Sequence, residues 1–168
     1  MSLAKDLLQQ AEHLATKERK KPRQASLRRA VSDAYYALFH LLVEDCCRQL
    51  ITGADAQALR DQVARAFVHA EMQRTSKAFA SAGLAPAVQA CLGGPLPREV
   101  QLVAAAFVEL QEARHEADYN LAKRLTRTET LDLIQRSSQA FQNWTIARVT
   151  LAVRTYLVSL LLGKQWSR

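Results

Sequence analysis

The chain has 168 residues, of which 49% are hydrophobic and 23% are charged, and its formal net charge at pH 7 is +7. This composition is that of an ordinary globular protein, and the length is enough for one domain with a sizeable core. The five glycines and four prolines fall mostly between segments of helical periodicity, which argues against a sheet protein with many tight turns. We therefore expect a single all-helical domain over residues 1–168.

Apolar residues at helical spacing predict five helices in chain order. They cover about residues 3–18, 24–51, 55–70, 97–121 and 126–162, and the third either continues or bends and restarts through residues 72–83. Ser2 is placed to cap the first helix, Pro22 separates it from the second, and Gly53 is placed to end the second. Residues 91–97 form a loop. The expected fold is an antiparallel bundle of four to five helices.

The last predicted helix begins at a capping box and is unusually long. Thr126 and Glu129 have the spacing at which each side chain accepts the other's backbone N–H. Unbroken, this helix runs about thirty-five residues, longer than a small monomeric bundle needs. Beyond Trp144 its apolar side chains surround most of the helix, so we expect residues 145–168 to form a helical extension that contacts a second copy of the chain. The prediction is a homodimer.

Two features bear on membrane insertion and location. The most apolar stretch, Ile146–Leu162, is interrupted by Arg148 and Arg154, and either would be costly at the centre of a bilayer. The first residues lack a basic segment followed by an apolar run, so we expect no signal peptide. These features predict a cytoplasmic protein without a membrane span.

The three cysteines indicate thiols rather than metal ligands or disulfides. Cys46 and Cys47 are adjacent and point in different directions on a helix, so they cannot clamp one ion between them, and Cys91 is distant in sequence. An odd number of cysteines without a secretory leader favours reduced, mostly buried thiols. The chain also lacks a His-Glu-x-x-His pattern, a Gly-rich phosphate loop and a nucleophile elbow. We expect neither a metal nor a cofactor.

One face of the second predicted helix carries an unusual polar stripe. Arg29, Asp33, Tyr36 and His40 are spaced i, i+4, i+7 and i+11, which places them on one side of the helix. A solvated face is the usual explanation for such a stripe, but tyrosine and histidine are poor choices for that purpose. Together these residue types can bind a ligand or move protons.

A similar cluster on the fourth predicted helix consists of Arg114, His115, Asp118 and Tyr119. In both clusters the arginine precedes the aspartate by four residues, which is the weaker order for an ion pair within a helix. We therefore expect the pairs to cross between helices: Arg29 with Asp118, and Asp33 with Arg114. Structural ion pairing is the simpler role for these residues, and ligand binding is the alternative.

Positive charge is concentrated in one short stretch. The cations are Lys17, Arg19, Lys20, Lys21, Arg23, Arg28 and Arg29. A solvated turn between helices is the simplest explanation, and a polyanionic partner such as nucleic acid is the alternative.

Three segments resemble blocks of the HEPN domain superfamily. The segment Ser26-Leu-Arg-Arg-Ala-Val-Ser-Asp-Ala-Tyr-Tyr-Ala-Leu-Phe-His40 resembles its second-helix signature. Arg65-Ala-Phe-Val-His69 with Met72, and Arg114-His-Glu-Ala-Asp-Tyr119, resemble later blocks of one branch, and the resemblance covers about residues 2–145. It implies a bundle of four or five helices, often dimeric. Some members are metal-independent ribonucleases or toxins, often paired with a nucleotidyltransferase-like antitoxin, and others are non-catalytic modules that bind RNA or a nucleotide.

The ribonuclease branch carries an arginine and, after four to six intervening residues, a histidine, which supply a cation and a base for attack by a ribose hydroxyl on its phosphate. No histidine of this chain has an arginine at that spacing before it; Arg65 and His69 come closest, with three residues between them. We therefore expect a non-catalytic HEPN-like module, dimeric, that binds RNA, a nucleotide or a protein partner such as a nucleotidyltransferase-like protein, in a toxin–antitoxin or stress-response system. One alternative is a divergent ribonuclease with His40 or His69 as base beside Arg29 or Arg114. The other is a helical interaction protein without a ligand.

Residues from three predicted helices are expected to line the binding groove. They are Arg28, Arg29, Asp33, Tyr36, His40, Arg65, His69, Arg114, Asp118 and Tyr119. The arginines are placed to contact phosphate, and Tyr35, Tyr36 or Tyr119 to stack on bases.

Overall fold

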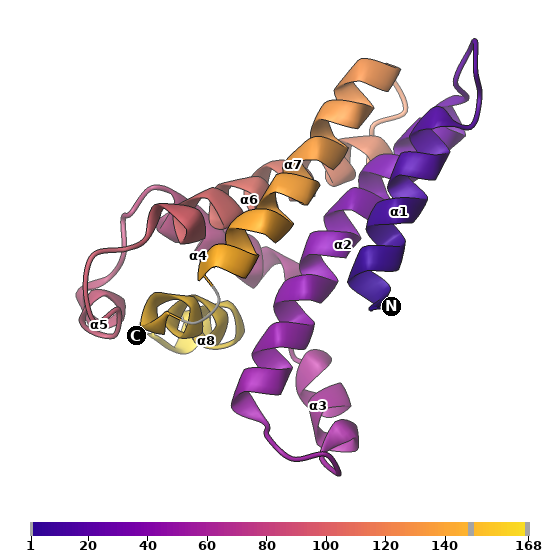
Figure 1. Ribbon diagram of the computed structural model, residues 1–168. Helices are drawn as coiled ribbons and strands as arrows, with labels where there is room; N and C mark the ends of the chain where they lie inside the picture. Colours follow the sequence, from indigo (N-terminus) through magenta and orange to yellow (C-terminus); the bar gives the residue numbers. More distant parts are fainter. Residues whose placement is uncertain (1, 148–149, 167–168) are drawn as a thin grey trace. The chain divides into compact units, whose positions relative to one another are not determined.

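The computed structural model describes residues 2–147 and 150–166 of the chain (Figure 1). All regular structure in these residues is helical, which confirms the predicted fold class. The helices are α1 (Leu3–Thr16), α2 (Gln24–Leu50), α3 (Gln57–Ala64), α4 (His69–Ala80), α5 (Pro86–Ala90), α6 (Arg98–Tyr119), α7 (Arg127–Ala147) and α8 (Leu151–Trp166). No helix among the described residues is both long and apolar enough to span a bilayer.

The chain forms two compact units, and the long helices contribute to both. The first unit comprises residues 1–40 and 106–142, and therefore contains α1, the first part of α2, the last part of α6 and most of α7. The second unit comprises residues 41–105 and 143–168, which include α3, α4, α5 and α8.

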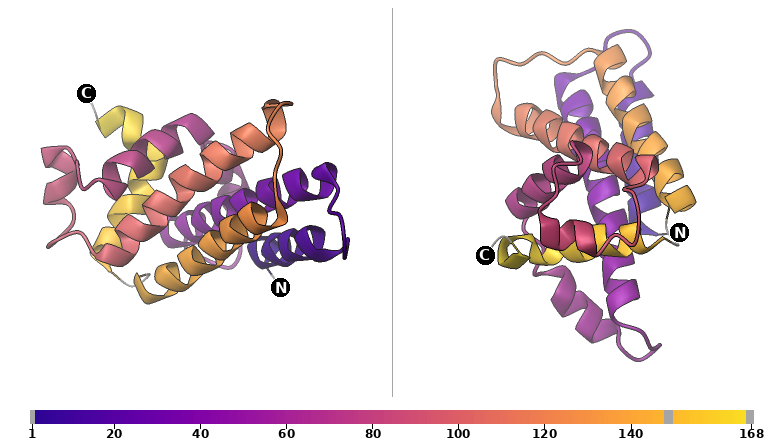
Figure 2. Two further views of the ribbon diagram at one scale, coloured as in Figure 1. Left: turned by 90° about the horizontal axis from the view of Figure 1, so that it is seen from above. Right: turned by 90° about the vertical axis from the view of Figure 1, so that its left-hand side faces the viewer.

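The first unit is a bundle of four helical segments around an aliphatic core. Leu27 and Val31 of α2 pack with Ala117 of α6 and with Leu125, just before α7, and all four side chains are buried. The Ser137 hydroxyl of α7 donates to the backbone oxygen of Ala34 on α2, at 2.9 Å. In Figures 1 and 2, α1 lies beside the first part of α2. Apolar side chains at helical spacing thus bring the predicted faces of α2 and α6 together, as the sequence indicates.

The second unit is centred on a buried aromatic group. The rings of Phe79 on α4 and Tyr156 on α8 have centroids 4.8 Å apart, and Trp144 packs against Tyr156 at 6.1 Å. The Tyr156 hydroxyl shares a hydrogen bond with that of Ser76, at 2.8 Å. The Trp144 indole N–H donates to a carboxylate oxygen of Asp45, at 3.0 Å. Because α4 and α5 pack on α8, much of the apolar surface of α8 is buried within the unit itself.

The long helix expected from residue 126 to about residue 162 is divided into α7 and α8, so that prediction is wrong. Arg148 lies outside the described residues. The Thr150 hydroxyl donates to the Ala147 carbonyl at 2.9 Å and accepts the Val153 N–H at 3.2 Å. One side chain therefore serves the last turn of α7 and the first turn of α8, where backbone groups lack partners within a helix.

Other boundaries follow the sequence with small differences. The third predicted helix restarts as α4 instead of continuing, and α5, with Pro86 in its first turn, was not expected. Ser2 precedes α1, but its side chain makes no capping hydrogen bond. Gly53 adopts a φ of 104° in the turn after α2, a conformation that favours glycine.

The predicted capping box at the start of α7 is confirmed. The Glu129 carboxylate accepts the Thr126 N–H at 2.8 Å, and the Thr126 hydroxyl accepts the Glu129 N–H at 3.1 Å. The Thr126 hydroxyl also donates to the carboxylate. The hydrogen bonds from the backbone and the side chain of Thr126, with that from Lys123, lower the pKa of Glu129.

Replacing the cap tests this local network. Thr126→Ala should lower the free energy of unfolding by about 1 kcal/mol, because an α7 N–H loses its acceptor. It should also raise the pKa of Glu129 toward its usual value, since one hydrogen bond to the carboxylate disappears. Urea denaturation and an NMR pH titration measure the two effects. The exposed Thr128 is the control, and Thr128→Ala should change neither; an unaltered Glu129 titration in Thr126→Ala would contradict the network.

Candidate binding site

Eight of the ten predicted site residues lie in the first unit, on α2 and α6. Arg65 and His69 belong to the second unit and do not share a helix. Arg65 follows the last residue of α3, and His69 is the first residue of α4, so the prediction of one helix over residues 55–70 that contains both is wrong. The break comes after Ala64, where α3 ends. The site is therefore built from α2 and α6 alone.

An arginine between two tyrosine rings is the centre of this site. The Arg114 guanidinium carbon is 5.5 Å from the ring centroid of Tyr36 and 5.7 Å from that of Tyr119. One of its N–H groups donates to the Tyr36 hydroxyl at 3.1 Å. The His115 ring lies 4.9 Å from that of Tyr119. We call Tyr36, Arg114, His115 and Tyr119 the Arg114 cluster, in which the two distances from Arg114 to the tyrosine rings are those of cation–π contacts.

The exposure of the aromatic rings decides which of them can meet a ligand. Tyr119 is 64% exposed, whereas Tyr35 is fully buried and packs against Phe107 at a centroid distance of 5.5 Å. Burial raises the pKa of Tyr35. Tyr36 is half-buried. The prediction that Tyr35 could stack on a base is therefore wrong, and Tyr119 is the ring best placed to do so.

The ion pairs run along the helices, not between them as predicted. Arg29 Nε lies 2.9 Å from Asp33 Oδ1, and Arg114 Nε lies 2.6 Å from Asp118 Oδ2. The interhelical contacts are made by hydroxyl groups instead. The Ser32 hydroxyl donates to the other oxygen of Asp118, at 2.6 Å, just as Tyr36 binds Arg114. These hydroxyls lie between the helices where the predicted pairs would have met.

Asp33 is the buried member of its pair. Its side chain is 1% exposed, and that of Arg29 is 64% exposed. Burial raises the pKa of Asp33, and the attraction and hydrogen bond of Arg29 oppose that rise only in part. Burial of a carboxylate whose one cationic partner is largely solvated lowers the free energy of unfolding.

Arg28 has a different role from the predicted one. Its guanidinium donates to the backbone oxygens of Ala117, Asn120 and Lys123, at 3.0 Å for Asn120. These carbonyls lie at the end of α6 and in the loop beyond it, where helix geometry supplies no donors. Arg28 therefore holds the end of α6 in place instead of contacting phosphate.

Two loops at one end of the first unit are tied together. The Gln24 side-chain amide donates to the Leu125 carbonyl at 2.8 Å and accepts the Leu125 N–H at 3.0 Å. The Arg127 guanidinium donates to the backbone oxygens of Ala15, Glu18 and Arg19. The α1–α2 loop and the α6–α7 loop are thereby fixed next to each other.

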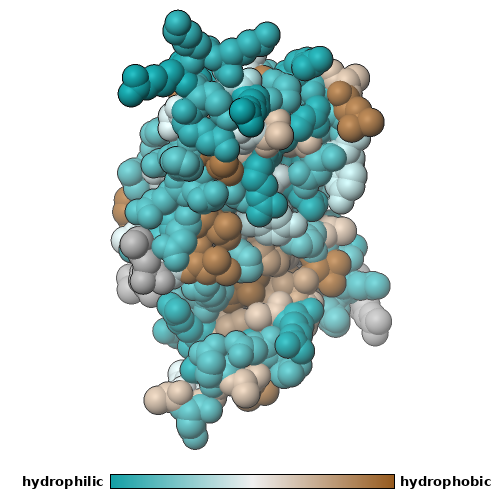
Figure 3. Space-filling model, turned by 90° about the vertical axis from the view of Figure 1, so that its right-hand side faces the viewer, coloured by the Kyte–Doolittle hydropathy of each residue, from teal (hydrophilic) through white to brown (hydrophobic). Residues whose placement is uncertain are grey.

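These loops expose cations without acidic partners. The set, called the basic loop pair below, consists of Arg19, Lys20, Lys21 and Arg124, all exposed. Within the described part of the chain no ion pair involves any of the four, whereas Lys17 and Arg23 share Glu18, at 3.9 and 4.0 Å. The upper part of the face drawn in Figure 3 is mostly hydrophilic. Arg124 was not among the predicted site residues, because only the folded loops bring it near the basic stretch.

A substitution of Arg28 tests its structural role. Arg28→Met should lower the free energy of unfolding by about 2 kcal/mol, because three carbonyls lose a charged donor at once. Arg23, with an 82% exposed side chain, is the matched control, and Arg23→Met should change stability by less than about 0.5 kcal/mol. Urea denaturation of both variants measures the difference. Equal losses in the two variants would contradict the role.

The buried Asp33 predicts a pH-dependent gain on substitution. Because its pKa is raised in the fold, the folded state favours the protonated form, and stability falls as pH rises from the ordinary aspartate pKa through the raised one. Asp33→Asn should therefore be more stable than the parent chain at pH 7. The gain should vanish near pH 3, where both states are protonated. Urea denaturation at several pH values measures it, with exposed Asp132→Asn as control; a gain that is the same at pH 3 and 7 would refute the assignment.

Comparisons with known proteins give no relative from which a function could be carried over. No family model, no curated protein and no solved structure matches the chain. Among the described residues, no three His, Cys, Asp or Glu side chains are grouped so that they could hold a metal ion. The Arg114 cluster and the basic loop pair are therefore the features of the chain that bear on its function.

Proposed function

We propose that this chain is a non-catalytic HEPN-like module that binds single-stranded RNA through its first unit. The observation that carries the proposal is the Arg114 guanidinium between the rings of Tyr36 and Tyr119, with Tyr119 64% exposed. An exposed ring beside a fixed cation offers a stacking surface for a base and a charge for its phosphate. The HEPN resemblance of the same segments supports RNA as the ligand.

The contacts of Arg114 support a binding role in addition to a structural one. Tyr36 and Asp118 engage one side of the guanidinium, which leaves further N–H groups for an incoming oxygen. The exposed side chain of Arg29, on the neighbouring helix, adds a second cation of the same unit. His115 extends the aromatic surface beside Tyr119. Stacking of this kind needs bases that are not already stacked in a duplex, which favours a single strand.

The basic loop pair supports a longer contact with the phosphate backbone. Its four cations are exposed, and none of them forms an ion pair with a carboxylate among residues 2–147 and 150–166. Each phosphate that such a cation neutralises releases condensed counterions, which strengthens binding at low salt. Tyr119 is the last residue of α6, and Arg124 lies in the loop that follows it. The stacking ring and one of the unpaired cations are thus joined by a short stretch of chain.

The binding role is favoured over RNA cleavage by the arrangement of the one histidine in the cluster. His115 adjoins Arg114 in sequence, and its ring packs on Tyr119. The ribonuclease branch of HEPN domains instead separates the arginine and the histidine by four to six residues. This difference supports a module that holds RNA without cutting it.

The proposal includes a homodimer and a partnership with a nucleotidyltransferase-like protein in a toxin–antitoxin or stress-response system, as the HEPN resemblance implies. Three large apolar side chains near the C-terminal end of the chain support a second copy: Ile146 is 67% exposed, Leu151 54% and Leu162 37%. Burying them would recover apolar surface that water now covers.

RNA binding is tested with a fluorescein-labelled single-stranded oligonucleotide and fluorescence anisotropy. Tyr119→Ala should weaken binding about tenfold, since stacking contributes roughly 1–3 kcal/mol per base. Lys20→Glu with Lys21→Glu should lower the slope of log affinity against log salt by about 1.4, the value for two lost phosphate contacts on a single strand. RNA recovered from the mixture without added metal should be intact on a gel.

The control for net charge is Lys5→Glu with Arg98→Glu, which removes the same charge at two other exposed positions. This control should keep the parent salt slope. An equal loss of slope in both double variants would show that net charge alone attracts RNA, and the site would be rejected. Cleaved RNA would overturn the non-catalytic part of the proposal.

A further inference from the structure

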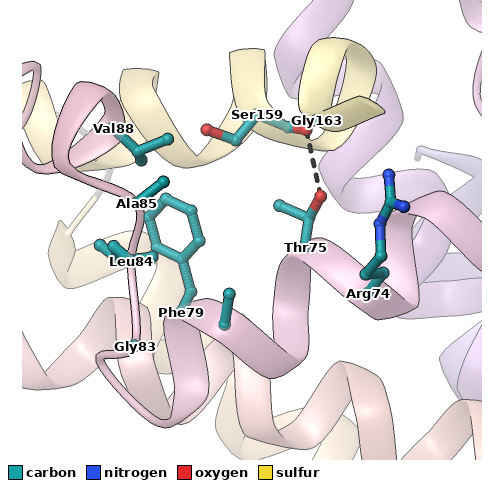
Figure 4. Close-up of a pocket in the computed structure, with 10 residues that line it drawn as sticks. Arg74, Thr75, Phe79, Gly83, Leu84, Ala85, Val88, Ser159 and Gly163 are labelled. Atoms are coloured by element: carbon teal, nitrogen blue, oxygen red, sulfur yellow. Dashed lines mark hydrogen bonds between the residues drawn. The ribbon is translucent and has the colours of Figure 1, made fainter. Parts of the chain in front are cut away.

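The second unit contains a cavity of about 250 Å³ that the proposed RNA site does not use. It lies among α4, the loop before α5, α5 and α8, and Figure 4 shows its lining. Phe79, Leu84 and Val88 form apolar walls, and Phe79 presents its ring to the interior (Figure 4). The remaining lining residues are small or hydroxylated, with a single exception, which is Arg74.

The hydroxyl groups on the lining already have acceptors in the protein. Thr75 donates to the backbone oxygen of Ser159 at 3.2 Å, the bond drawn in Figure 4. Ser159 donates to the backbone oxygen of Thr155 at 2.7 Å. Because these donors are satisfied, water gains little inside, and an apolar group that replaces it is favoured. The interior therefore suits the apolar body of a ligand.

Small residues keep the cavity open next to a close helix contact. A Cβ atom at Gly163 of α8 would collide with the Thr75 hydroxyl of α4, so the two helices approach as closely there as glycine allows. A glycine within a helix lowers stability by about 1 kcal/mol relative to alanine. The close approach of the two helices explains why position 163 is nevertheless a glycine. Ala78 and Ala85 leave the adjoining space unfilled. The walls are thus set by fixed helices, and the cavity is preformed.

Arg74 supplies charge at one end of the cavity. Its side chain is 56% exposed, and the one protein partner that the described residues give it is Glu71, which binds one terminal nitrogen. A guanidinium has five N–H donors, and a carboxylate can accept two of them at once. The other donors of Arg74 are therefore available to an anion whose apolar part lies against Phe79.

We propose that this cavity binds a small monocarboxylic acid with an apolar body, and that Arg74 holds its carboxylate. The volume is below the range of about 300–1,000 Å³ usual for drug-sized ligands, which favours a single ring or a short branched chain. Glu71, as a neighbouring negative charge, weakens the site for an anion. This site is independent of RNA binding, because it uses no residue of the Arg114 cluster or the basic loop pair.

The test compares 3-phenylpropionate with 3-phenylpropanol, a neutral molecule of nearly the same shape. Ligand-observed NMR and calorimetric titration of the full chain should show tighter binding of the acid. Arg74→Gln should weaken the acid about fivefold, the upper range for an exposed ion pair, and leave the alcohol unchanged. Glu71→Gln should strengthen the acid and not the alcohol.

A cavity-filling variant separates the site from surface attraction. Ala78→Leu should abolish binding of both molecules while the chain melts at the same temperature as the parent or higher, because a leucine side chain occupies an apolar space. Should Ala78→Leu melt earlier, Arg74→Gln and Glu71→Gln still test the proposal, because these side chains are 56% and 30% exposed and lie outside the core. Equal affinity for acid and alcohol, or no binding of either by the parent chain, would overturn the proposal. Acid binding that survives Ala78→Leu in a folded chain would also overturn it.

Discussion

The three hydrogen bonds from Arg28 to backbone oxygens fix the end of α6, and the candidate RNA site depends on them. Asp118 and Tyr119 are the last residues of that helix, and the loop beyond it carries Lys123 and Arg124. Without a donor for these carbonyls, the last turn would fray into water, and Tyr119 would lose its position beside Arg114. These three hydrogen bonds from α2 thus set the place of the ring and of the following loop.

Polar side chains also join α2 to α6. Two hydroxyls, of Ser32 and Tyr36, cross between the helices, while each arginine stays with the aspartate of its own helix. A hydroxyl is neutral and can donate or accept, so it crosses a buried seam at less desolvation cost than a charged pair. The arginines can then keep part of their surface in water. The side chain of Arg29 is thus 64% exposed, and that of Arg114 is 21% exposed.

The sequence predicts features that depend on near neighbours and misses those that depend on the fold. The capping box of Thr126 and Glu129 spans one helical turn, and its geometry is as predicted. The role of Arg28 has no local signal, because its acceptors at Ala117 and Lys123 are 89 and 95 residues away. The predicted ion pairs between helices were wrong for the same reason. Helix periodicity shows on which face of its helix a residue lies, but not which side chain of the neighbouring helix lies opposite.

The sequence also predicts some helix boundaries and misses others. Apolar periodicity places α1, α2 and α6 within a few residues, since each buries a continuous stripe. It cannot separate α7 from α8, because the apolar pattern of the sequence continues through the break. The Thr150 hydroxyl, which bonds the last turn of α7 and the first turn of α8, is no part of that pattern. The cavity beside Phe79 also escapes the sequence, since its walls come from residues as distant as Arg74 and Gly163.

The two parts of the proposed RNA site differ in how they would act. Arg114 is held by Tyr36 and Asp118 before any ligand arrives, so binding there orders few additional side-chain rotamers. The cations of the basic loop pair are exposed and unpaired, so they attract a polyanion over a distance of about one Debye length. Long-range attraction mainly raises association rates, whereas a preorganised close contact mainly slows dissociation. The loops would therefore govern how fast RNA arrives, and the Arg114 cluster how long it stays.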